Sequence, residues 1–162
     1  MSETLPVKMR VMENDVFHVA VSEAWQPVST GAETRPGEAS FQHAETGFAF
    51  HQSVLLYKDG KPSKAARKAA LEEVIKNRME SFGKGGHTLQ PGKAGFTEED
   101  WGWLVVTDVI LDSKLYGITA AYAFPECLLV HWVNGPTGQE DDVRQAIMKI
   151  MATVSYRTGK TA

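Results

Sequence analysis

Residues 101–132 read WGWLVVTDVILDSKLYGITAAYAFPECLLVHW, and this stretch decides the fold. Apolar residues alternate with others over three segments, at 101–111, 115–124 and 128–133. Alternation at period two is typical of strands. The connections between the segments have only about three residues, which suits hairpins, whereas a parallel crossover needs about a dozen residues or more. The stretch therefore predicts a mostly antiparallel sheet.

An amphipathic helix follows this sheet. Thr137 and Glu140 have the spacing of a capping box, and Asp141 and Asp142 favour the positively polarised start of a helix. The apolar positions then recur at helical spacing, namely Val143, Ile147, Ile150, Met151 and Val154. Because such a stripe occupies one side of a helix, we expect this helix to cover one face of the sheet.

The first half of the chain predicts short strands and a loop. Alternation indicates strands at residues 7–12, 16–21, 39–44 and 48–57. The last two read as a pair around a turn at residues 45–47. Glycine, proline and small polar residues predict a loop at 29–38.

A second helix is expected after Ser63, whose hydroxyl can accept a hydrogen bond from a free amide of the first turn. Its apolar stripe consists of Leu71, Val74, Ile75, Met79 and Phe82. Gly83 and the pair Gly85 and Gly86 supply the backbone freedom that ends a helix. A short strand at 87–90 and a loop up to residue 100 are expected next.

These elements predict an α+β fold, in which a mostly antiparallel sheet of about six strands packs against two principal helices as a sandwich. We expect one domain over residues 1–162, with a flexible tail at 158–162. The composition, 43% hydrophobic and 23% charged, is that of a globular protein.

Several features bear on location. Cys127 is the only cysteine, so an internal disulfide is excluded and a reducing compartment is favoured. The apolar runs fall far short of the ~20 residues that span a bilayer, and we recognise no secretory signal. We therefore expect a cytoplasmic protein that does not contact a membrane.

Charge is unevenly distributed. The chain has a net charge of −3, but residues 58–93 carry nine bases and four acids. This segment therefore has a net charge of +5, and the rest of the chain has a net charge of −8. Such asymmetry can attract an acidic partner. Nucleic-acid binding is not expected, because only Phe82 offers an aromatic ring among these bases.

The reactive residue types do not form a recognisable site. Cys127 and His131 would lie about 13 Å apart along one strand, too far for a thiolate–imidazole pair, which needs about 3 Å. The five histidines show no ligand spacing, and the glycines at 83–86 follow a helix instead of preceding one, unlike a phosphate-binding loop. We predict no catalytic residue, no cofactor and no metal.

The aromatic residues of the last strands are the candidates for partner binding. Trp101 and Trp103 are expected to share a face of the sheet. If the two helices leave part of the sheet open, it would offer a concave apolar surface to a peptide or an apolar ligand. The candidate residues are Trp101, Trp103, Tyr116, Tyr122 and Trp132.

The chain resembles the PsbP/DcrB-like superfamily in three places. The stretch Val19-Ala-Val-Ser-Glu-Ala-Trp25 is similar to that group's opening strand, turn and tryptophan. The basic helix stands where theirs does, and Val154-Ser-Tyr-Arg157 resembles the strand after their closing helix. The resemblance implies a binding scaffold without cofactors. Its bacterial members include chaperones of type VI secretion effectors, which hold apolar helices in a groove on the sheet, and it implies a cytoplasmic protein that pairs with itself.

The leading hypothesis is therefore a non-enzymatic binding protein, a bacterial secretion-associated chaperone or adaptor that holds an apolar segment of a protein partner on its sheet. One alternative is an immunity or inhibitor protein that blocks a partner toxin through a charged surface, such as the basic helix at 63–82. Another is a small hydrolase whose site is not recognisable from sequence.

Overall fold

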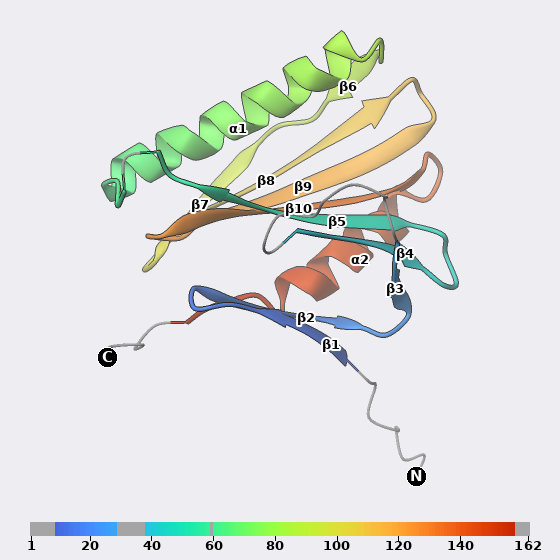
Figure 1. Ribbon diagram of the computed structural model, residues 1–162. Coiled ribbons are helices and arrows are strands. Elements are labelled where there is room, and N and C mark those ends of the chain that lie inside the picture. Colours follow the sequence, from blue (N-terminus) through green and yellow to red (C-terminus); the bar gives the residue numbers. More distant parts are fainter. Residues whose placement is uncertain (1–8, 29–37, 59, 158–162) are drawn as a thin grey trace.

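The computed structural model describes residues 9–28, 38–58 and 60–157 of the chain (Figure 1). In these ranges the chain forms eleven strands in two sheets, and two α-helices. The strands are β1 (Met9–Glu13), β2 (Phe17–Ser22), β3 (Trp25–Pro27), β4 (Ala39–His43), β5 (Ala49–Leu56), β6 (Leu89–Pro91), β7 (Gly95–Glu99), β8 (Gly102–Leu111), β9 (Leu115–Ala123), β10 (Cys127–Pro136) and β11 (Ser155–Tyr156). The helices are α1 (Lys64–Lys84) and α2 (Glu140–Met151).

The larger sheet has the order β3-β4-β5-β10-β9-β8-β6, and β7 also pairs with β8. Every pairing is antiparallel. Strands β8, β9 and β10 form a meander of two hairpins, in which Leu111 pairs with Leu115 and Ala123 with Leu128. The α+β class, the antiparallel sheet and the pairing of β4 with β5 confirm the expectations from sequence.

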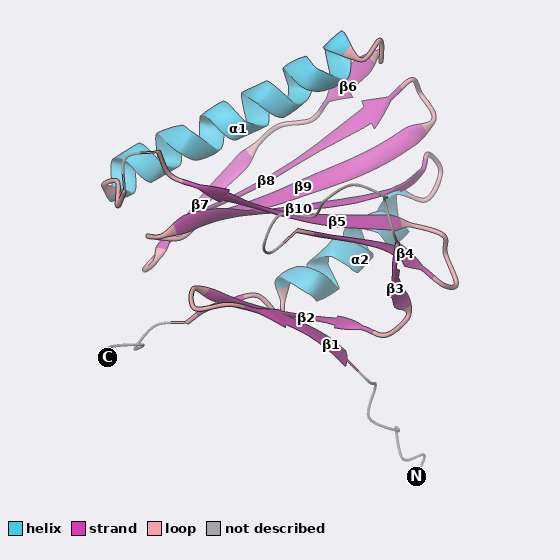
Figure 2. Ribbon diagram, viewed as in Figure 1, coloured by secondary structure: helices cyan, strands magenta, loops and turns pink. Residues whose placement is uncertain are grey.

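The smaller sheet has the order β1-β2-β11. The residue Thr153 links it to the end of α2, because its hydroxyl donates to the carbonyl of Ala20 at 2.8 Å and accepts from the amide of Ala20 at 3.0 Å. The small sheet and α2 lie together on one face of the large sheet, and α1 lies on the other (Figure 2). Neither helix in these ranges is long and apolar enough to span a bilayer.

The large sheet consequently has an apolar core on each face. The core on the side of α2 includes the buried residues Phe17, Val19, Phe50, Ile118, Leu129, Val143 and Ile147. The core on the side of α1 includes Leu71, Val105, Ala121, Leu128 and Val130, with Val109 and Trp132 beyond them. Burial of each large apolar side chain stabilises the fold by about 1.5–3 kcal/mol.

The start of α1 is as predicted and the start of α2 is not. The Ser63 hydroxyl accepts from the amide of Ala66 at 3.2 Å, which caps α1. At α2 the predicted capping box is wrong, because the N-cap is Gln139 and the hydroxyl of Thr137 donates to the carbonyl of Ser113 instead. The positive φ of Gly138 turns the chain here, so Thr137 lies against the β8–β9 turn and not over the helix start.

The expected number of strands was too small. The additional strands are mostly short edge strands, such as β3, β7 and β11, and residues 95–99 belong to β7 where a loop was expected. Alternation is weak in such strands because their side chains are only partly buried. The first two residues of the strand expected at 7–12, most of the loop expected at 29–38 and the tail expected at 158–162 lie outside the described residues.

We predict that Gly117→Ala lowers the free energy of unfolding by about 1–3 kcal/mol, because a Cβ at this position would overlap the indole ring of Trp132. Gly83→Ala is the control, since nothing lies within 4 Å of its Cβ and alanine favours a helix by up to ~1 kcal/mol. Urea unfolding followed by tryptophan fluorescence measures both variants. Equal stability of Gly117→Ala and the parent chain would contradict this account of the packing.

Candidate functional site

Three of the five candidate aromatic residues are buried in the two cores. Tyr116 and Tyr122 are each 3% exposed and Trp132 is 9% exposed. Tyr122 stacks on Phe124 in the core beside α2, whereas Trp132 packs against Phe82 of α1 with ring centroids 5.4 Å apart. These three side chains therefore stabilise the fold, and a partner could reach them only after a rearrangement.

The expectation that Trp101 and Trp103 share a face is wrong. Trp101 packs on the side of α2, where its ring centroid lies 4.7 Å from that of Phe124. Trp103 lies on the side of α1, below the amine of Lys68. The reason is that Trp101 belongs to the turn before β8, and Gly102, with φ of 152°, changes the chain direction between the two residues.

The concave aromatic face expected from sequence is absent from the described part of the sheet. Helix α1 covers β8 and β9, and its apolar side chains reach Leu128 and Val130 of β10. On β4 and β5, beyond the helix, polar residues lie on this face, where the hydroxyl of Ser40 is 2.6 Å from Nδ1 of His51. A partner-binding role for the five aromatic residues stays a prediction, and only Trp101 and Trp103 are partly exposed.

Cys127 and His131 are both core residues. Burial, together with the nearby carboxylate of Glu126, raises the pKa of the Cys127 thiol to about 11. Burial also lowers the pKa of His131 to about 3, so the imidazole is neutral near pH 7. Its Nε2 lies 2.8 Å from Oε1 of Gln52, and its ring meets that of Phe50 edge-on. Neither side chain is placed to act as a nucleophile or a base on a ligand at the surface.

The basic segment is partly used inside the protein. Arg67 donates to the carbonyls of Pro62 and Trp101, at 3.0 and 3.2 Å. The guanidinium of Arg78 lies over the ring of Trp132, 5.2 Å from its centroid. These two arginines therefore stabilise the docking of α1. Of its lysines, Lys76 and Lys84 are exposed, whereas Lys68 lies over the ring of Trp103. In the described ranges, no group of three or more His, Cys, Asp or Glu side chains could hold a metal ion.

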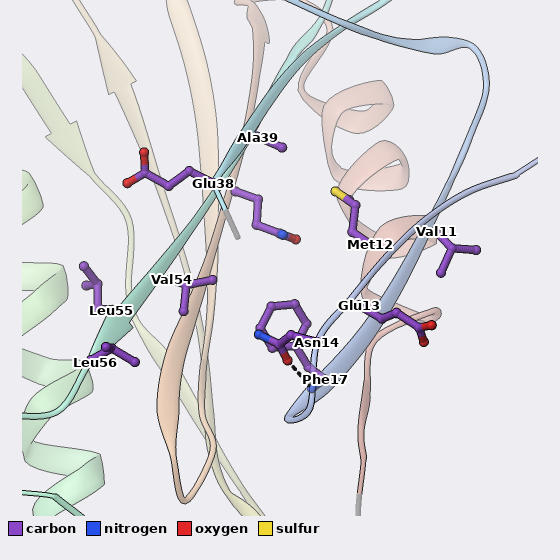
Figure 3. A pocket seen from close by; sticks show the side chains of 11 residues that line it. Val11, Met12, Glu13, Asn14, Phe17, Glu38, Ala39, Val54, Leu55 and Leu56 are labelled. Atoms are coloured by element: carbon purple, nitrogen blue, oxygen red, sulfur yellow. Dashed lines mark hydrogen bonds between the residues drawn. The ribbon is translucent and has the colours of Figure 1, made fainter. Parts of the chain in front are cut away.

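A groove of about 750 Å³ lies between the two sheets, and we call it the inter-sheet groove (Figure 3). One wall is the β1–β2 hairpin and the other is formed by the start of β4 and the end of β5. Its size falls within the range of about 300–1,000 Å³ that is common for ligand sites. Its apolar lining consists mainly of Val11, Met12, Phe17, Val54, Leu55 and Leu56.

Apolar side chains enter the groove from both walls. Met12 and Phe17 of the hairpin and Val54 of β5 point into it, and Leu56 at the end of β5 is 79% exposed. Val11 is 56% exposed, but its side chain points away from the groove. The acids Glu13 and Glu38 stand one on each wall, and their side chains point away from the groove (Figure 3). Sequence reasoning missed this site because single apolar residues on two distant strands carry no local signal.

Neither a family model nor a curated protein sequence matches the chain. Solved structures do match. The cyanobacterial PsbP (CyanoP) from Synechocystis sp. PCC 6803 aligns with a TM-score of 0.62 at 8% identity, over 96% of each chain. The chain has the PsbP-like fold. The Ran-binding protein Mog1p from Saccharomyces cerevisiae aligns with a TM-score of 0.56 at 10% identity, over 94% of this chain and 97% of its own.

The PsbP-like fold confirms the resemblance inferred from residues 19–25 and 154–157. Identities of 8–10% are too low to transfer a function, so these neighbours establish the fold alone. The function of this chain therefore depends on its own residues, above all those of the inter-sheet groove.

We predict that His131 makes the protein less stable as the pH falls. Its native pKa of about 3 lies below the ordinary 6.5, so between these values the unfolded chain binds a proton that the native state does not. The free energy of unfolding should fall by up to about 1.4 kcal/mol per pH unit in this window. Denaturant unfolding between pH 7 and pH 5 should show a smaller dependence of the free energy of unfolding on pH for His131→Gln than for the parent chain. An unchanged slope in His131→Gln would refute the assignment.

We also predict that Cys127 resists alkylation in the folded protein. At about pH 8, few thiols with a pKa raised to about 11 are ionised, and the buried sulfur is poorly accessible. Mass spectrometry should find little modification by iodoacetamide in the native chain and complete modification in urea. Rapid modification of the native thiol would show that this part of β10 opens readily.

Proposed function

We propose that the protein is a non-enzymatic binding protein that holds an apolar segment of a protein partner in the inter-sheet groove. Its role would be that of a secretion-associated chaperone or adaptor. The observation that carries the proposal is a groove of about 750 Å³ into which the apolar side chains of Met12, Phe17 and Val54 point from its two walls, with Leu56 79% exposed at the end of β5. Clustered exposed apolar side chains are costly in water and commonly mark a site of interaction.

The reactive residues support a binding role by their positions. Cys127 is buried with a raised pKa, and His131 is buried with a lowered pKa and a hydrogen bond to Gln52. Both are thereby held in their uncharged forms in the core. The fold is compatible with protein binding, since the neighbour Mog1p is described as Ran-binding. This second argument is an analogy of fold and carries less weight than the groove.

The charged-surface inhibitor is the alternative function. Its support is the exposed lysines of α1, although Lys64 is paired with Glu98 at 2.9 Å and Arg67 and Arg78 are turned inward. A complex steered by surface charge weakens strongly as salt concentration rises, whereas one made by an apolar groove does not. The homodimer and the cytoplasmic location implied by the resemblance stay predictions.

Affinity capture from a lysate of the source cells, quantified by mass spectrometry, tests the proposal. We expect a specific partner to be retained by the parent chain at high salt and lost by Leu56→Asp, which places a charge in the groove. The matched control is Met148→Asp, because Met148 is 63% exposed but lies on α2, outside the groove. Both variants should keep the thermal stability of the parent.

Two results would contradict this proposal. If Leu56→Asp retains the partner as well as the parent chain does, the inter-sheet groove is not the binding surface. If the partner is released at high salt and also by charge reversal of exposed lysines such as Lys76 on α1, the inhibitor function replaces the groove function.

A further inference from the structure

We propose that a second pocket, between α2 and the strands β8 and β9, binds a small organic acid with an apolar tail. We call it the α2 pocket, and it lies on the face of the large sheet opposite to α1 (Figure 2). Its volume of about 350 Å³ is at the lower end of the range common for ligand sites. It shares no lining residue with the inter-sheet groove, so this inference goes beyond the proposed function and does not depend on it.

The floor of the α2 pocket is apolar. Ile118 of β9 and Ile147 of α2 are buried, and Val106 of β8 is partly buried. Met148 and Met151 of α2 complete the apolar lining, and Met148 is 63% exposed. Methionine side chains are flexible and polarisable, so they adapt to the shape of an apolar ligand. The tail of a ligand would remove this surface from water.

A β-bulge brings a cation to the pocket. Strands β6 and β7 both pair with β8, and the three residues 92–94 between them face only two residues of β8, Thr107 and Asp108. The extra residue of a bulge redirects a side chain, and bulges are common beside active sites. Lys93 belongs to this bulge and lines the pocket, and it forms no ion pair with any other described residue.

The acid of the pocket is engaged within the protein. The hydroxyl of Tyr116 donates to Oδ2 of Asp108 at 2.7 Å. The other oxygen of Asp108 lies where a Cβ on Gly92 would overlap it, so this glycine leaves the space that the carboxylate occupies. Burial and the hydrogen bond raise the pKa of Tyr116 to about 12, so the phenol keeps its proton and continues to donate. The charge of Asp108 is therefore partly offset before a ligand binds.

The second cation of the pocket is Arg144 of α2. Its guanidinium lies over the ring of Tyr116, 5.4 Å from the centroid, and it pairs with Asp141 of the same helix. The side chain of Arg144 is 48% exposed, and a guanidinium has five N–H donors, so donors remain for a ligand. Two cations from different elements thus border one apolar floor. An acid with an apolar tail matches both features, whereas a neutral ligand matches only the floor.

The test uses the purified full chain and four probes that separate the head group from the tail. Octanoate carries both, 1-octanol offers the tail without charge, octylammonium offers the tail with the opposite charge, and acetate has the head group alone. Isothermal titration calorimetry at low salt measures the affinity of each probe. We expect saturable binding of octanoate, about fivefold or more tighter than that of 1-octanol, because a charge-assisted hydrogen bond is gained. Octylammonium and acetate should bind more weakly still.

Variants of the two cations test the head-group contact. Lys93→Gln and Arg144→Gln should each weaken octanoate by about threefold or more and leave 1-octanol unchanged. The matched control is Lys149→Gln, which removes a charge from α2 outside this pocket and should bind octanoate as the parent chain does. Lys93→Glu should reverse the preference, so that octylammonium binds more tightly than octanoate. A loss of folding cannot produce such a reversal.

Two variants distinguish the α2 pocket from the inter-sheet groove. Met148→Asp places an acid in the lining of the α2 pocket, so it should abolish octanoate binding while it keeps the captured protein partner. Leu56→Asp should have the opposite effects, since Leu56 lines only the groove.

Four results would overturn the inferred acid site. They are the lack of saturable octanoate binding, equal affinities for octanoate and 1-octanol, an equal loss of affinity in Lys149→Gln and Lys93→Gln, and abolition of octanoate binding by Leu56→Asp instead of Met148→Asp. The proposed function is decided separately, by partner capture with Leu56→Asp, so either proposal can fail while the other stands.

Discussion

Burial of the β8–β9–β10 meander on both of its faces is the constraint on which the rest of the structure depends. Strand β9 is buried almost throughout, with Ala120, Ala121 and Ala123 fully inaccessible. Its small side chains allow α1 to approach one face and α2 with the small sheet the other, and Gly117 leaves the space that the ring of Trp132 occupies. A sheet covered in this way must hold its bulky aromatic residues as core, because water is excluded from both sides.

That burial also determines which chemistry is accessible. Cys127 and His131 lie on the central strand β10, so both lose hydration and both are held uncharged. A binding surface for a partner is therefore expected at the margin of the large sheet, beyond the helices and the small sheet that cover its faces. The small sheet and β5 diverge there, and the result is the inter-sheet groove. The proposed binding role arises from this incomplete closure.

Local patterns predicted the elements that are long and strongly amphipathic. The alternation in residues 101–132 predicted three strands, and Ser63 predicted the start of α1. The local patterns did not predict the short strands β3 and β7, because partly exposed edge strands need no strict alternation. The capping box at Thr137 failed for a related reason: its hydroxyl found a partner in Ser113, which is distant in sequence and adjacent only in the fold.

The sequence by itself determined the periodicities, and hence the fold class, the PsbP-like resemblance and the lack of a recognisable catalytic motif. Periodicity depends only on neighbouring residues. Tertiary structure alone decided that Trp101 and Trp103 face opposite cores, that Tyr116, Tyr122 and Trp132 are buried, and that Met12 and Val54 share a groove. Which face of a strand is covered, and where two sheets part, depends on contacts between segments far apart in the chain, and no local pattern records these contacts.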